Sequence, residues 1–282
     1  MRRAIYILCN DFTPAGIRKN YLENEEEHSR FAQVGRAPKV QSFEVPDFLA
    51  RMDGLGVEKV LVAAIKTWSM RQQALLEHST NEEVIALTEA APGRIYGLFG
   101  INMHQGMKGV AELERMVKEH GFVGAHLHPH GYGNPPNHAY YFPYYAKCME
   151  LGVPVIVSMG HTLDLMPIDP GRPIHLDQVA LYFPDLAIVC THTGWPWVEE
   201  AIAIAWKHPN VFLGTSAYAP RHWKPEMVKF INSHGRDKCL WATDFPLIDH
   251  QEALDQIEAL GLREESKHKF LYANAARVFR FE

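Results

Sequence analysis

Short apolar runs recur along the whole chain and predict β-strands. Most of these runs are continuous rather than alternating, which is typical of strands that are buried on both faces of a parallel sheet. We predict strands over Ala4–Leu8, Lys59–Ile65, Ile95–Ile101, Phe122–His128, Val153–Ser158, Leu186–Thr191, Val211–Ser216 and Lys238–Thr243.

Amphipathic helices are predicted between these strands. In Val45–Gly56, for example, Phe48, Met52 and Leu55 fall on one helical stripe. The predicted helices are Val45–Gly56, Asn81–Ala91, Gly106–His120, Tyr140–Leu151, Ile174–Phe183, Pro196–His208, Lys224–His234 and Gln251–Leu260.

Strict alternation of strands and helices favours an α/β fold, a single (β/α)₈ TIM barrel that occupies residues 1–282 as one domain. A doubly wound open sheet is the main alternative. It usually has a glycine-rich phosphate loop after its first strand, and CNDFTPAG is not such a loop. The polar, aperiodic segment Phe12–Ser42 is interpreted as an insertion after the first strand. Three roles stay open for this segment: a lid, an oligomer contact, or a solvent-exposed loop without a function of its own.

Composition narrows the classes of function. The chain has 47% hydrophobic and 22% charged residues and a net charge of −5, so nothing indicates a nucleic-acid or anionic-membrane partner. No apolar run is long enough to span a bilayer. The four cysteines are widely separated and form no CxxC pair, which favours reduced thiols and a cytoplasmic protein.

The chain contains 16 histidines, and many of them follow predicted strands. In a barrel, functional groups gather where the strands end. His128 ends the fourth predicted strand and His161 follows the fifth, whereas His192 and Asp244 directly follow the sixth and eighth. A single histidine there is more often structural, but a polar group directly after an apolar strand is costly unless it has a role. Four histidines fall in loops, where we expect them to be exposed to solvent: His104, His130, His138 and His222.

Two segments together resemble a known family. IVCTHTGWPWVEEAIAIAWKHPNVFLGTSAYAP, followed by CLWATDFPL, is similar to the amidohydrolase-related family, in the branch of aminocarboxymuconate-semialdehyde decarboxylase. MDGLGVEKVLV, GFVGAHLHPHG and YYFPYYAKCMELGVPVIV also resemble parts of that family. The resemblance implies a (β/α)₈ barrel, a divalent metal (zinc or manganese) and the decarboxylation or hydrolysis of small carboxylated molecules. It matches Asp244 to an aspartate that contacts metal and water, and His192 to an acid/base or ligand.

The chain departs from the family at its first strand. The family pattern Asp-x-His-x-His falls on Tyr6, Leu8 and Asn10, and its fifth-strand histidine falls on Ser158. Three explanations stay open. The metal site is rebuilt with His128 or His161 and with Asn10 or Asp11; the enzyme works without metal; or the chain is catalytically silent. The ligand set that we predict is His128, His161, His192 and Asp244, with weaker metal retention than in relatives that keep all the ligands.

The resulting hypothesis is an amidohydrolase-superfamily enzyme that decarboxylates a small carboxylated cyclic or aromatic metabolite. Hydrolysis of an amide or lactone and a non-catalytic ligand-binding barrel are the alternatives. His192 and Asp244 are the predicted catalytic pair, facing each other so that the carboxylate favours a protonated imidazole.

Four further residues are predicted to bind substrate. Arg221 is either a carboxylate clamp or part of a surface salt bridge. Trp68, Trp195 and Tyr218 either form walls for a flat molecule or pack in the core. We expect a small-molecule substrate and a homodimer or larger homo-oligomer.

Overall fold

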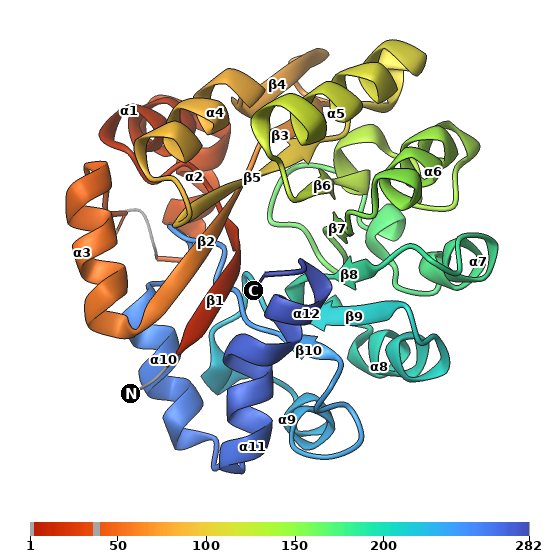
Figure 1. Cartoon of the computed structure of the whole chain (residues 1–282). Coiled ribbons are helices and arrows are strands. Elements are labelled where there is room, and N and C mark those ends of the chain that lie inside the picture. Colours follow the sequence, from red (N-terminus) through yellow and green to blue (C-terminus); the bar gives the residue numbers. More distant parts are fainter. Residues whose placement is uncertain (1–2, 36–39, 282) are drawn as a thin grey trace.

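The computed structural model describes residues 3–35 and 40–281. Its centre is a sheet of eight parallel strands in the order β1-β2-β5-β6-β7-β8-β9-β10 (Figure 1). The strands are β1 (Ala4–Cys9), β2 (Val57–Ala63), β5 (Ile95–Gly100), β6 (Gly124–Leu127), β7 (Val155–Val157), β8 (Ile188–Cys190), β9 (Val211–Gly214) and β10 (Cys239–Leu240). Each of the eight predicted strands is present, which confirms the barrel.

The first and last strands close the barrel through a few hydrogen bonds. Ile7 N donates to Trp241 O, and a parallel bridge pairs Cys9 with Phe245. Every residue of β1 is buried, as expected for a strand with helices on one side and the barrel interior on the other.

Helices surround the strands (Figure 1). They are α3 (Val45–Leu55), α4 (Asn81–Ala90), α5 (Met107–His120), α6 (Phe142–Leu151), α7 (His175–Tyr182), α8 (Val198–Lys207), α9 (Pro225–Ile231) and α10 (His250–Ala259). All eight predicted helices are therefore confirmed. After α10, the chain continues through α11 (Glu264–His268), a π-helical turn (Lys269–Ala273) and α12 (Asn274–Val278). The ring of Phe279 then lies near Gly124, at the start of β6, so this segment lies at the end of the barrel where the strands begin.

Two features differ from the expectation. The predicted strand Lys59–Ile65 is split, because β2 ends at Ala63 and Ile65 begins an antiparallel hairpin of β3 (Ile65–Ser69) and β4 (Ala74–Ser79). The predicted insertion is partly helical, with α1 (Pro14–Ile17), a π-helix (Arg18–Leu22) and α2 (Glu25–Gln33). Residues 36–39 of that insertion lie outside the described residues.

The insertion has its own small core. Ile17, Tyr21 and Phe31 pack together, and Leu247 packs against them from the loop after β10. The insertion is thus docked over the end of the barrel where β10 finishes. Among residues 3–35 and 40–281, no helix is long and apolar enough to cross a membrane.

Candidate active site

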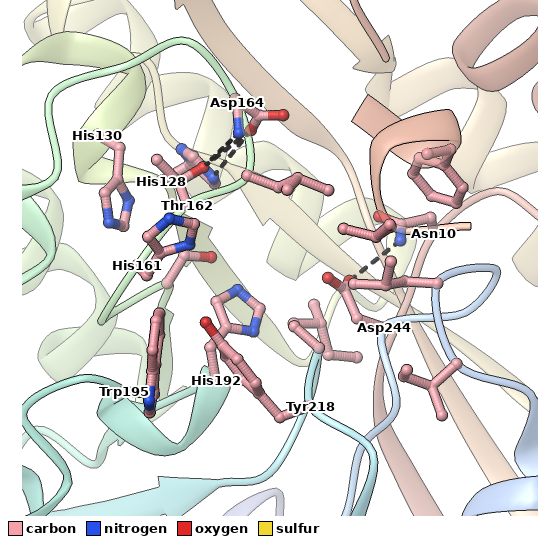
Figure 2. A pocket seen from close by; sticks show the side chains of 18 of the residues that line it. Asn10, His128, His130, His161, Thr162, Asp164, His192, Trp195, Tyr218 and Asp244 are labelled. Atoms are coloured by element: carbon pink, nitrogen blue, oxygen red, sulfur yellow. Dashed lines mark hydrogen bonds and ion pairs between the residues drawn. The ribbon is translucent and has the colours of Figure 1, made fainter. Parts of the chain in front are cut away.

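A cavity of about 520 Å³ opens where the strands end. That volume is in the range of small-molecule sites. Figure 2 shows His128, His130, His161 and Asp164 on one side of it and Asn10 and Asp244 on the other. His192 and Tyr218 lie between these two sides, and Trp195 lies near His161 on the histidine side (Figure 2). The cavity therefore joins residues from the ends of β1, β6, β7, β8, β9 and β10.

Asp244 is held by the first strand. Asn10 Nδ2 donates to Asp244 Oδ1 over 3.0 Å and to Phe245 O over 2.9 Å. Burial raises the pKa of Asp244 to about 6, against the opposing effect of the Asn10 hydrogen bond. A carboxyl with this pKa changes its protonation state close to neutral pH, so it is suited to acid or base catalysis.

His192 is oriented by Ser216. Ser216 Oγ lies 2.8 Å from His192 Nδ1 and also accepts the backbone N–H of His192. This arrangement favours Nδ1 as the acceptor and leaves Nε2–H to donate to a bound molecule. Burial lowers the pKa of His192 to about 4, so its ring is neutral at pH 7. The predicted protonated imidazole beside Asp244 is therefore wrong, because the desolvation of His192 outweighs the hydrogen bond with Ser216 and the attraction of Asp164.

The backbone is strained at three neighbouring strand ends. His192 (φ 59°), Ala217 (φ 66°) and Asp244 (φ 60°) are all in the left-handed region, although none of them is glycine. Each such residue costs about 1–3 kcal/mol, and such strain concentrates at functional sites. All three residues line the cavity. The strain supports the assignment of this cavity as the active site.

A row of imidazoles covers the β6 side of the cavity. His126 Nε2 pairs with Ser158 Oγ at 3.0 Å, and His130 Nε2 donates to Gly160 O at 2.8 Å. Burial lowers the pKa of His128 to about 4 and that of His130 to about 3, so these rings are neutral. The expectation of a solvent-exposed His130 is wrong, because its ring packs beneath the loop that carries Gly160.

Three of the four predicted substrate-binding residues line the cavity. Trp195 contacts Tyr218, with ring centroids 5.7 Å apart. Arg221 also lines the cavity, and its Nη1 donates to Glu252 Oε1 over 2.7 Å. The predicted alternative, that Arg221 belongs to a surface salt bridge, is therefore observed. Trp68 is not in the described lining. It lies on β3 and packs edge-on against His104, which supports its packing interpretation.

The predicted metal ligands do not assemble into a ligand set. His128, His161, His192 and Asp244 all line the cavity. However, within the described parts of the chain, no three His, Cys, Asp or Glu side chains lie close enough together to hold a metal ion. Leu8 offers no lone pair. Asp11, which was proposed with Asn10 as a replacement ligand, is outside the described lining of the cavity. Its carboxylate accepts hydrogen bonds from Thr13 instead.

Several lining residues were not singled out from the sequence. His78 lies on β4, and its Nε2 is 3.2 Å from Thr67 Oγ1 on β3. It could be identified as a site residue only if the β3–β4 hairpin had been predicted. Asp164 follows β7 and lies 3.9 Å from His128 Nε2, in a loop with no local signal. Tyr21 and Phe31 come from the insertion, so this segment contributes to the cavity as the lid interpretation predicts.

Comparison with known families decides the relationship. A family model described as amidohydrolase matches residues 32–281. The chain belongs to this amidohydrolase family. Two curated relatives of the amidohydrolase are enzymes. One is 2-keto-4-carboxy-3-hexenedioate hydratase from Sphingobium, 25% identical, with 60% of each chain covered. The other is gamma-resorcylate decarboxylase from Polaromonas, 24% identical, with 67% of this chain and 71% of the relative covered.

Solved structures confirm the fold of the amidohydrolase. A TIM-barrel protein from Bordetella bronchiseptica has a TM-score of 0.78 at 23% identity, with 98% of both chains covered. 2,6-Dihydroxybenzoate decarboxylase from Rhizobium has a TM-score of 0.71 at 17% identity, with 99% of both covered. Dihydroxybenzoic acid decarboxylase from Polaromonas, solved with manganese and 2-nitroresorcinol, has a TM-score of 0.69 at 19% identity, with 99% of this chain and 97% of that chain covered.

Proposed function

We propose that this amidohydrolase decarboxylates a hydroxylated aromatic monocarboxylate. The proposal is carried by the position of Asp244, a largely buried carboxyl that faces a cavity of about 520 Å³, large enough for a substituted aromatic ring. The cavity also has aromatic side chains, Trp195 and Tyr218, against which a flat ring can pack. The activities of the related decarboxylases support the same substrate class.

The charge of the cavity favours a monocarboxylate over a polycarboxylate. Among the described lining residues, Arg221 is the only Lys or Arg, and it is paired with Glu252. Asp164 and Asp244 line the same cavity, and burial keeps the imidazoles of His128 and His192 neutral. A substrate with several carboxylates, such as the hexenedioate of the hydratase, would meet too little positive charge.

In the proposed reaction, Asp244 is the acid. The ring carbon that bears the carboxylate takes the proton from Asp244, using a π-electron pair of the ring to form the new C–H bond. The bond to the carboxylate then breaks, its electron pair restores the aromatic ring, and CO₂ leaves. The Asp244 carboxylate regains a proton from water after the product departs. An anionic substrate raises the pKa of Asp244 further, which keeps the acid protonated in the complex.

The other residues bind and orient the substrate. His192 Nε2–H donates to the ring hydroxyl oxygen next to the reacting carbon, and it does so as a neutral ring. The row of imidazoles on the β6 side of the cavity offers further neutral groups to the carboxylate of the substrate. Tyr21 and Phe31 cover the cavity from the insertion and limit the access of water. No step is assigned to a metal, because the cavity residues do not form a ligand set.

Turnover of a substrate panel tests the proposal. The panel contains hydroxybenzoates, with 2,6-dihydroxybenzoate among them, and lactones and amides to detect hydrolysis. We expect CO₂ release from a hydroxybenzoate and a loss of at least about 10²-fold in Asp244→Asn. Asp177→Asn is the matched control, because Asp177 pairs with Lys207 and His208 outside the cavity. Hydrolysis of a lactone or amide without any CO₂ release would contradict the proposal.

A further inference from the structure

The first strand makes a cluster of hydrogen bonds to the residues on both sides of Asp244. Tyr6 Oη accepts the backbone N–H of Phe245 over 2.7 Å and lies 2.8 Å from Thr243 Oγ1. Asn10 donates to Phe245 O from its backbone N at 3.2 Å and from Nδ2 at 2.9 Å. Its Nδ2 also donates to Asp244 Oδ1.

These bonds hold a residue that the backbone alone does not favour. Asp244 has a left-handed φ of 60°, and such a conformation persists only where its surroundings fix it. Tyr6 is fully buried and lies outside the described cavity lining, whereas Asn10 reaches the cavity. Tyr6 can therefore act on a bound substrate only through the loop that carries Asp244.

We propose that Asn10 and Tyr6 are positioning residues for Asp244, and that this arrangement replaces a resident metal at the first strand. Asn10 hydrogen-bonds Asp244 directly, and Tyr6 fixes its neighbours Thr243 and Phe245. Asn10 Nδ2 supplies the positive end of a dipole to Asp244 Oδ1. Leu8, between these two residues in sequence, lines the cavity with an apolar side chain that cannot ligate a metal. The proposal rests on the proposed role of Asp244, so two of its three tests do not depend on activity.

The first test measures metal directly. The protein is expressed in medium supplemented with Mn²⁺ and Zn²⁺, purified, and analysed by elemental mass spectrometry. Binding of added Mn²⁺ is then followed by electron paramagnetic resonance. We expect less than about 0.1 metal ion per chain and no saturable Mn²⁺ binding at micromolar concentrations, because ligand number sets affinity. If the wild type held one metal ion per chain and Asp244→Asn lost it, the proposal that these residues replace a metal would be overturned.

The second test is a double-mutant cycle on thermal stability at pH 8. Asn10→Leu removes the donor with little change of shape, and we expect it to lower Tm by about 3–6 °C, since it leaves Asp244 without its donor. In an Asp244→Asn background the same substitution should cost clearly less, since the carboxylate charge is gone. If the changes in Tm caused by Asn10→Leu and Asp244→Asn were additive, the proposed direct interaction between Asn10 and Asp244 would be overturned.

The third test separates positioning from packing. Tyr6→Phe should lower kcat by about 10-fold or more with KM unchanged, because Tyr6 is outside the described lining but sets the placement of Asp244. Tyr145→Phe is the matched control, since Tyr145 is equally buried and its hydroxyl donates to Pro136 O. An unchanged kcat in Tyr6→Phe, or an equal loss in the control, would show that Tyr6 only closes the barrel. If no substrate is found, the first two tests still decide whether a metal is replaced and whether Asn10 holds Asp244.

Discussion

Replacing Asp244 with asparagine should stabilise the protein at alkaline pH. The amide has a similar shape, and its oxygen can still accept the hydrogen bond from Asn10. The pKa of Asp244 is about 6 in the folded protein, against about 3.9 for an unfolded aspartate, and this difference corresponds to about 3 kcal/mol. Because Asp244 lines the cavity and is not completely buried, we expect a stabilisation of about 1–3 kcal/mol.

The sign of the effect follows from linkage. Because the pKa is raised in the folded state, the folded protein binds more protons than the unfolded chain. The ionised carboxyl of Asp244 therefore destabilises the folded protein by its full amount above about pH 6. This destabilisation disappears as pH falls from 6 towards 4. Asp244→Asn should therefore have a Tm about 2–6 °C above that of the wild type at pH 8, and the gain should fall to about half at pH 5.

Differential scanning fluorimetry from pH 5 to pH 8 measures this gain. Asp177→Asn is the control with the opposite sign, because hydrogen bonds from Lys207 and His208 hold the pKa of Asp177 below its usual range. It should lower Tm at pH 8. A gain for Asp244→Asn that is the same at every pH, or a loss at pH 8, would refute the assignment of Asp244 as a carboxyl destabilised by burial.

Three further predictions concern the cavity and the core. The kcat/KM for decarboxylation should fall as pH rises through about 6, since Asp244 must be protonated; a rise through the same pH would indicate that Asp244 acts as a base. Trp195→Ala should raise KM by about 10-fold with little change in kcat, because it removes a wall of the cavity; unchanged KM in steady-state kinetics would contradict this. Burial raises the pKa of the Cys148 and Cys190 thiols to about 12, so Ellman's reagent should react with them only after unfolding, and rapid reaction of the native protein would refute their burial.

The sequence was sufficient for the barrel because its strands are continuous apolar runs. Such runs, separated by amphipathic helices, have few other ways to bury their surface. The hairpin of β3 and β4 was missed because β2 continues almost directly into it. Only Ala64 separates the end of β2 from the start of β3, and no turn residue marks the break.

The candidate site could be predicted only in part. His192 and Asp244 were identified because each follows a buried strand, where a polar group stands out. The electrostatic state of His192 was predicted wrongly, because the burial that keeps its ring neutral comes from other elements that enclose it. Likewise, the partner of Asp244 is Asn10, 234 positions away in sequence, and only the closed barrel brings them together.

Metal-independent decarboxylation is tested most directly by the release of CO₂ from 2,6-dihydroxybenzoate and related hydroxybenzoates by the purified protein treated with chelator. We predict turnover that survives chelation, that Asp177→Asn retains, and that Asp244→Asn loses by at least about 10²-fold. CO₂ release that persists in Asp244→Asn, or that appears only after a divalent metal is added, would contradict metal-independent catalysis by Asp244.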